Sequence, residues 1–115
     1  MYKDEALFLL KGGKDGILEW NRNVASGKAN LDLTGAKLPA AKLMGANLVG
    51  ARLSQADLNW ADLTGADLSG ANLNRAALDG TKLHKARLNN SDLSLTHLRQ
   101  ADSLGISGNR GIAAH

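Results

Sequence analysis

The side chains that could do chemistry are few in this sequence. Histidine and carboxylate groups act as metal ligands, or as general acids and bases, when a fold gathers them in a water-excluding pocket. Here the three histidines are His84, His97 and His115, cysteine is absent, and no two histidines have the spacing of metal ligands. The sequence also lacks a Gly-rich phosphate loop. We therefore expect no catalytic residue, no metal site, no cofactor and no enzymatic activity.

The elements that position these side chains are set by a repeat of five residues. Leucine occurs fourteen times in succession at this period, at 33, 38, 43, 48, 53, 58, 63, 68, 73, 78, 83, 88, 93 and 98. Two residues before each of these leucines, after the first unit, stands Ala, Ser or Thr, and Gly often ends the unit. The unit is A-(D/N)-L-x-x.

Neither regular secondary structure keeps residues five apart on one side. Five residues turn an α-helix by about 500°, and an odd period sends successive strand residues to opposite faces. The leucines can all lie inside only if the chain bends once per unit, with the small residue beside each leucine. A core built from Leu and Ala also agrees with an aromatic content of only 3%.

This pattern resembles the pentapeptide-repeat family over residues 29–102. The resemblance implies an all-β solenoid, a right-handed quadrilateral β-helix in which four units form one coil of twenty residues. We expect the β-helix to span residues 31–102, about three and a half coils, between a helical cap at 1–30 and a C-terminal tail at 103–115.

The N-terminal segment is expected to form two short helices, at 3–11 and 15–25, with Asp15 as a helix N-cap. Ile17, Trp20 and Val24 form an apolar stripe suited to covering the first coil. An amphipathic membrane anchor is the alternative. Since no signal peptide or membrane-spanning stretch is visible, we expect a cytoplasmic protein with no membrane partner.

The opposite end lacks a comparable segment. The repeat loses register at Asp102, and the Gly-rich residues that follow are a poor cover for the last coil. Leu104 and Ile106 fold over this end, or another molecule covers it, or the natural chain is longer. We predict a homodimer through this coil, whose inward leucines are Leu83, Leu88, Leu93 and Leu98.

Residues twenty apart should be vertical neighbours, so the outer surface can be examined in columns. Opposite charges alternate in several of them, as in Lys42, Asp62 and Lys82, which suggests cross-strand pairing and a solvated face. The last coil is basic, but no aromatic residues are interleaved with its cations. Nucleic acid is therefore an unlikely partner.

Outward positions that carry apolar residues are the candidate interaction surface: Pro39, Ala40, Met44, Val49 and Trp60. Trp60 has Ala40 and Gly80 as column neighbours, so its ring has room to lie along the face. Tryptophan is enriched at binding hot spots. The alternatives are that Trp60 only covers its small neighbours, or lies under the N-terminal segment.

Two functions are compatible with these features. The first is a structural scaffold or protein–protein interaction module with an unidentified protein partner. The second follows from the resemblance, because some members of the family are acidic DNA mimics that bind type II topoisomerases. The net charge of +3, with six acids against eight Lys and Arg across 31–100, disfavours the second function.

Overall fold

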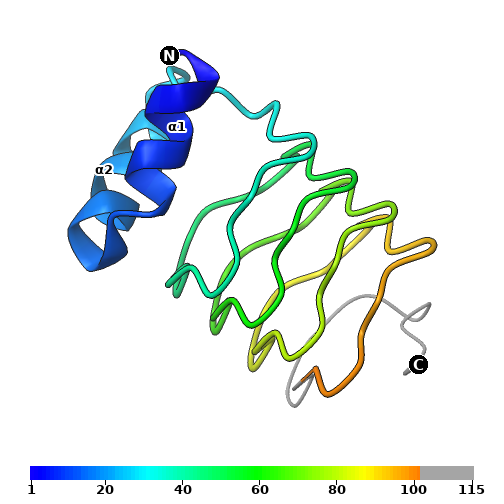
Figure 1. The fold of residues 1–115 in the computed structure, drawn as a ribbon. Coiled ribbons are helices and arrows are strands. Elements are labelled where there is room, and N and C mark those ends of the chain that lie inside the picture. Colours follow the sequence, from blue (N-terminus) through cyan, green and yellow to red (C-terminus); the bar gives the residue numbers. More distant parts are fainter. Residues whose placement is uncertain (102–115) are drawn as a thin grey trace.

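A computed structural model describes residues 1–101 of the chain. Two helices, α1 (Lys3–Leu10) and α2 (Gly13–Ala25), pack against each other at one end of a stack of coils (Figure 1). The expected C-terminal tail, with Leu104 and Ile106, lies outside the described residues.

Backbone pairing defines the coil as twenty residues long. Ten parallel bridges each join residues twenty apart, from Asp32–Arg52 to Ala77–His97. Within one pair, the Leu33 N–H donates to Arg52 O and the Arg52 N–H donates to Leu31 O, both at 2.8 Å. In the described residues these pairings are single-residue bridges and not the longer strands expected of an all-β fold. The reason is that a turn interrupts the chain every five residues.

The turn has the same geometry in every unit. The N–H of the small residue donates to the leucine carbonyl three residues before it, as in Ala36 to Leu33 at 3.0 Å. The residue just before the small one has a positive φ, as at the third position of a type II turn. All fourteen such positions from 35 to 100 share this φ, and eight carry a residue other than glycine: Ala40, Gln55, Trp60, Arg75, Lys85, Asn90, Leu95 and Gln100.

The interior consists of the residues that the repeat places inside. The inward leucines from Leu33 to Leu88 are at most 1% exposed, and the alanines two residues before them are buried too. Thr81 replaces alanine at one small position without leaving a polar group unsatisfied, because its hydroxyl donates to Leu58 O at 2.8 Å. The five-residue register predicted from the sequence is thereby confirmed in the core.

The helices cover the first coil with the apolar stripe of α2. Ile17 and Trp20 are buried against the leucine core. The two helices approach closely at Gly16, where a Cβ atom would lie 2.1 Å from Leu9 O. Asp15 is not the N-cap of α2, because the helix already begins at Gly13 and Asp15 lies in its first turn.

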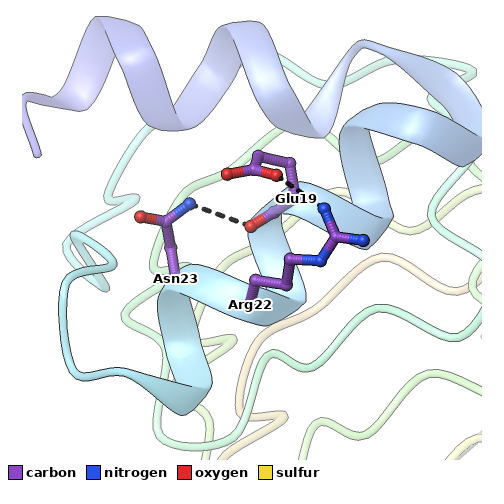
Figure 2. Close-up of polar contacts among 3 residues, drawn as sticks. All are labelled: Glu19, Arg22 and Asn23. Carbon is purple, nitrogen blue, oxygen red and sulfur yellow. Dashed lines mark hydrogen bonds and ion pairs between the residues drawn. The ribbon is translucent and has the colours of Figure 1, made fainter.

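Polar contacts lie on the exposed side of α2, which also carries Leu18. Arg22 forms an ion pair with Glu19 at 3.1 Å, and the Asn23 amide donates to Glu19 O at 2.9 Å (Figure 2). Both interactions are exposed, so they add little to stability.

Candidate interaction surface

Trp60 is the largest of the apolar side chains exposed on the coils. Its side chain is on the surface, with the residue 63% exposed, and the backbone has a left-handed φ of 64°. The indole covers Gly80, the residue one coil further along in the same column, where an added Cβ would lie 2.2 Å from Cε3 of the ring. Ala40 occupies the same column one coil earlier, with Pro39 beside it in the same turn, and both are exposed.

Met44 and Val49 do not join this column. They lie in the next two turns of the first coil and belong to the columns of Thr64 and Ser69. Met44 is half-exposed and borders a hollow beside Leu18 of α2. The five apolar residues proposed from the sequence therefore lie at three corners of the stack, and only Pro39, Ala40 and Trp60 lie at the same corner.

A hollow of about 580 Å³ separates the helical cap from the first coil, next to this column. Lys11 and Gly13, at the junction of the two helices, line one part of it. The rest is lined by residues 37–42 of the first coil, which include Lys37, Pro39 and Lys42. No acidic side chain is among the lining residues.

The helical cap forms hydrogen bonds with the upper edge of the first coil on two of its four sides. On the Asn47 side, Trp20 Nε1 donates to Asn47 O and the Asn47 N–H donates to Asn21 Oδ1, both at 2.8 Å. On the Asp32 side, Lys3 Nζ donates to Thr34 O and the Asp32 N–H donates to Asn30 Oδ1 at 2.9 Å. These side chains take the places that backbone groups of a preceding coil would occupy.

The other two sides of that edge are open. Among residues 1–101, no hydrogen bond satisfies the main-chain N–H of Lys37 or of Lys42, or the carbonyls of Lys37, Pro39 and Lys42. In lower coils the corresponding groups are paired; for example, the Asp57 N–H donates to Ala36 O and Asp57 O accepts from Leu38. The hollow therefore borders an unpaired stretch of strand edge.

The Asp and Asn residues of the repeat have a local role that the sequence analysis missed. The side chain of each accepts the N–H two residues later, as in Asn59 to Asp57 and Thr64 to Asp62, both at 3.0 Å. Short Asx turns of this kind stabilise the bend that follows. A Ser, Thr or Asn two residues after Asp or Asn, present in many units, was the available signal.

These turns replace the expected ladder of charge pairs. The columns of alternating charge exist, since Lys42, Asp62 and Lys82 are bridged in succession. Within residues 1–101, however, the single ion pair is that between Arg22 and Glu19. The column carboxylates point to their own turns instead.

Two of the carboxylates have altered acidity. The Thr34 hydroxyl and then the Thr34 N–H lower the pKa of Asp32. In the same way, the Ser94 hydroxyl and then its N–H lower the pKa of Asp92. Hydrogen bonds to the ionised form are the cause in both cases.

At the other end of the stack, the predicted dimer surface lies mostly inside the coil. Leu83, Leu88 and Leu98 are buried and Leu93 is partly buried. The residues after 101 lie outside the described part of the chain. Homodimerisation through this end stays a prediction.

The described residues show no gathered catalytic or metal-binding groups. His84 lies in a turn of one column and His97 in the bridge column of Ala77. No three His, Asp or Glu side chains within 1–101 are placed to hold a metal ion. Neither helix of this part of the chain has the length and apolar character needed to cross a bilayer.

Comparison with known proteins identifies the family to which this repeat belongs. The sequence matches Pentapeptide repeats, in eight copies, over residues 29–70 and 61–100. The chain belongs to the pentapeptide-repeat family. A comparison with curated proteins finds no match.

One solved pentapeptide-repeat structure is similar to this chain in fold. A pentapeptide repeat protein from the thylakoid lumen of Arabidopsis thaliana is 24% identical, with a TM-score of 0.68, over 72% of this chain and 57% of that one. This likeness concerns the fold alone. The chain thus spans little more than half the length of this relative.

Two further structures are less similar in shape. A pentapeptide repeat protein from the cyanobacterium Cyanothece is 30% identical over 68% of this chain and 54% of that one, with a TM-score of 0.39. The plasmid-mediated fluoroquinolone resistance protein QnrB1 is 22% identical over 65% of this chain and 39% of that one, with a TM-score of 0.37.

Proposed function

We propose that this pentapeptide-repeat chain is a non-enzymatic scaffold that binds another protein through the corner formed by Pro39, Ala40 and Trp60. The scaffold in this proposal is a right-handed, four-sided β-helix. The observation that carries the proposal is the exposed indole of Trp60, held in a left-handed turn above Gly80.

This placement of Trp60 is energetically unfavourable for the isolated chain. A left-handed backbone costs a residue other than glycine about 1–2 kcal/mol, and six equivalent turns in the coils carry glycine instead. Packing of the indole on Gly80 offsets part of this cost, but most of the surface of Trp60 stays in water. A protein partner that buried the rest would recover more, since tryptophan is a frequent binding anchor.

The role of a DNA mimic has less support. Such a mimic needs a continuous acidic face, whereas the column of Lys42, Asp62 and Lys82 alternates in sign. The last coil adds further cations at Lys85, Arg87 and Arg99. A DNA-binding groove lined with basic residues would be repelled by this surface.

A pull-down from an extract of the source organism tests the interaction role. The wild-type chain is compared with Trp60→Ala and with Leu95→Ala, a matched control that removes another exposed side chain from a left-handed turn. We expect a protein captured by the wild type and by Leu95→Ala to be lost with Trp60→Ala. Equal capture by all three folded proteins would overturn the proposal.

A further inference from the structure

We propose that the open edge of the first coil, from Lys37 to Lys42, binds an extended acidic segment of a partner protein by β-strand pairing. The inference deepens the proposed interaction role, because Pro39 and Ala40 belong to both surfaces. It names the chemistry of the partner: an extended chain whose free main-chain groups pair with the coil and whose side chains carry carboxylates.

The pairing groups are already arranged as a coil edge. The N–H groups of Lys37 and Lys42 and the carbonyls of Lys37, Pro39 and Lys42 correspond to groups that every lower coil pairs with the coil before it. Elsewhere on this edge, Asn21, Trp20 and Lys3 act as substitutes for the missing coil. A peptide strand in the hollow would supply the same bonds along the Lys37 side or the Lys42 side, as in β-strand addition. A bend beside Pro39 and Ala40, like that of a preceding coil, would carry the peptide across both sides.

Space and shape also permit a strand at this place. The hollow between the cap and the coil is about 580 Å³ and is lined by backbone and by small or flexible side chains. Leu38 and Ala41 are turned inward and buried there, so a strand on the edge would not expose the core. The edge is therefore accessible without any rearrangement of the coil.

The charge of the hollow selects an acidic chain. Lys11, Lys37 and Lys42 line it, and no acid does. The acids that follow Lys37 and Lys42 in their columns are Asp57 and Asp62, whose carboxylates accept N–H groups of their own turns. Lys37 and Lys42 form no ion pair with any acid of residues 1–101. Complementary charge would speed the encounter and favour carboxylates at this edge.

The test uses a defined peptide and the isotope-labelled chain. The probe is a short, end-blocked peptide of alternating Glu and Val, titrated while the protein amide signals are followed by NMR. We expect the amide signals of Lys37 and Lys42 to shift and their hydrogen exchange to slow. The peptide with Lys in place of Glu should bind much more weakly. Added salt should lower the affinity of the acidic peptide, because it screens the attraction between opposite charges.

Matched variants distinguish peptide binding at this edge from nonspecific attraction between the acidic peptide and the basic protein. Lys37→Glu with Lys42→Glu should raise the Kd by about tenfold or more, which is about 1.4 kcal/mol. The control carries the same charge change at Lys82→Glu and Lys85→Glu, exposed residues of the last coil, and should bind within about twofold of the wild type. Equal loss in both double variants would overturn the proposal.

Backbone pairing is tested by methylating the peptide nitrogens. Two peptides carry N-methyl groups at alternate residues, one in each phase, and the phase that faces the edge should lose binding. Retained binding of both methylated peptides would overturn strand pairing, as would no binding of the parent peptide. Leu95→Ala, which lies on neither surface, should leave peptide affinity unchanged. The pull-down with Trp60→Ala reports on the corner alone, so the two proposals can fail separately.

Discussion

The indole of Trp60 covers the backbone of Gly80, twenty residues later in the sequence and one coil away in the structure. Three ring atoms, Cε3, Cζ3 and Cδ2, lie within 2.6 Å of where a Gly80 Cβ would stand. The absence of a side chain at Gly80 is therefore what allows the ring to pack along the face. The backbone N–H of Trp60 also donates to Asp79 O at 2.7 Å, which links the turn of Trp60 to the next coil.

Gly80→Ala should consequently be more destabilising than an alanine at another glycine turn. Gly70 is the control, because its φ of +68° is close to the +67° of Gly80 and the nearest atom to an added Cβ is 4.0 Å away. We expect Gly70→Ala to cost about 1 kcal/mol from backbone strain, and Gly80→Ala about 1 kcal/mol more as the ring is displaced. Urea unfolding measures both; equal costs would contradict the packing of Trp60 on Gly80.

Backbone strain at the turns predicts a pair of opposite effects. Gln55 is exposed with a φ of 62°, and Gly50 occupies the preceding turn with a φ of 68°. Gln55→Gly should stabilise the fold by up to about 1 kcal/mol, and Gly50→Gln should destabilise it by about 1–2 kcal/mol. Thermal unfolding of the two variants decides this, and effects of the same sign would argue against left-handed turns.

Substitution inside the coil should be far more damaging than substitution at an outward position. Leu63 is fully buried between neighbouring coils, so Leu63→Ala should cost about 2–5 kcal/mol. Leu63→Asp should prevent folding, because an unpaired carboxylate would be buried. Ser69→Ala, at an outward turn position, should change stability by less than about 0.5 kcal/mol. Circular dichroism melts test the contrast, and similar losses at both positions would disprove the register.

Stability should fall in acid partly because of Asp32 and Asp92. Their pKa values in the folded chain lie below the ordinary 3.8, so the ionised groups stabilise the fold above that pH. This contribution is lost as the pH falls through the folded pKa values, and it is modest because both groups are exposed.

The double variant Asp32→Asn, Asp92→Asn keeps an acceptor for each turn but removes the titration. Its melting temperature should therefore fall less steeply than that of the wild type between about pH 5 and about pH 2. Parallel curves for the two proteins would show that these carboxylates do not contribute to the acid sensitivity.

The sequence by itself determined the period and the contents of the interior. Fourteen leucines recur at intervals of five, and after the first unit each has a small residue two positions before it. This pattern permits one inside and one outside, because only a bend in every unit keeps all the leucines together. The same regularity identified the family and the column in which Trp60 lies between Ala40 and Gly80. These features are local or strictly repeated, so they can be deduced without coordinates.

Only the tertiary structure decided how single residues use that frame. The aspartates bond to the turns that follow them instead of forming charge ladders, because a carboxylate reaches the N–H two residues later more readily than a lysine in the next coil. Trp20 and Asn21 replace a missing coil on one side, while the edge from Lys37 to Lys42 stays open. Such contacts depend on how a non-repeating helix pair sits on a repeating coil, and no periodic pattern encodes that placement.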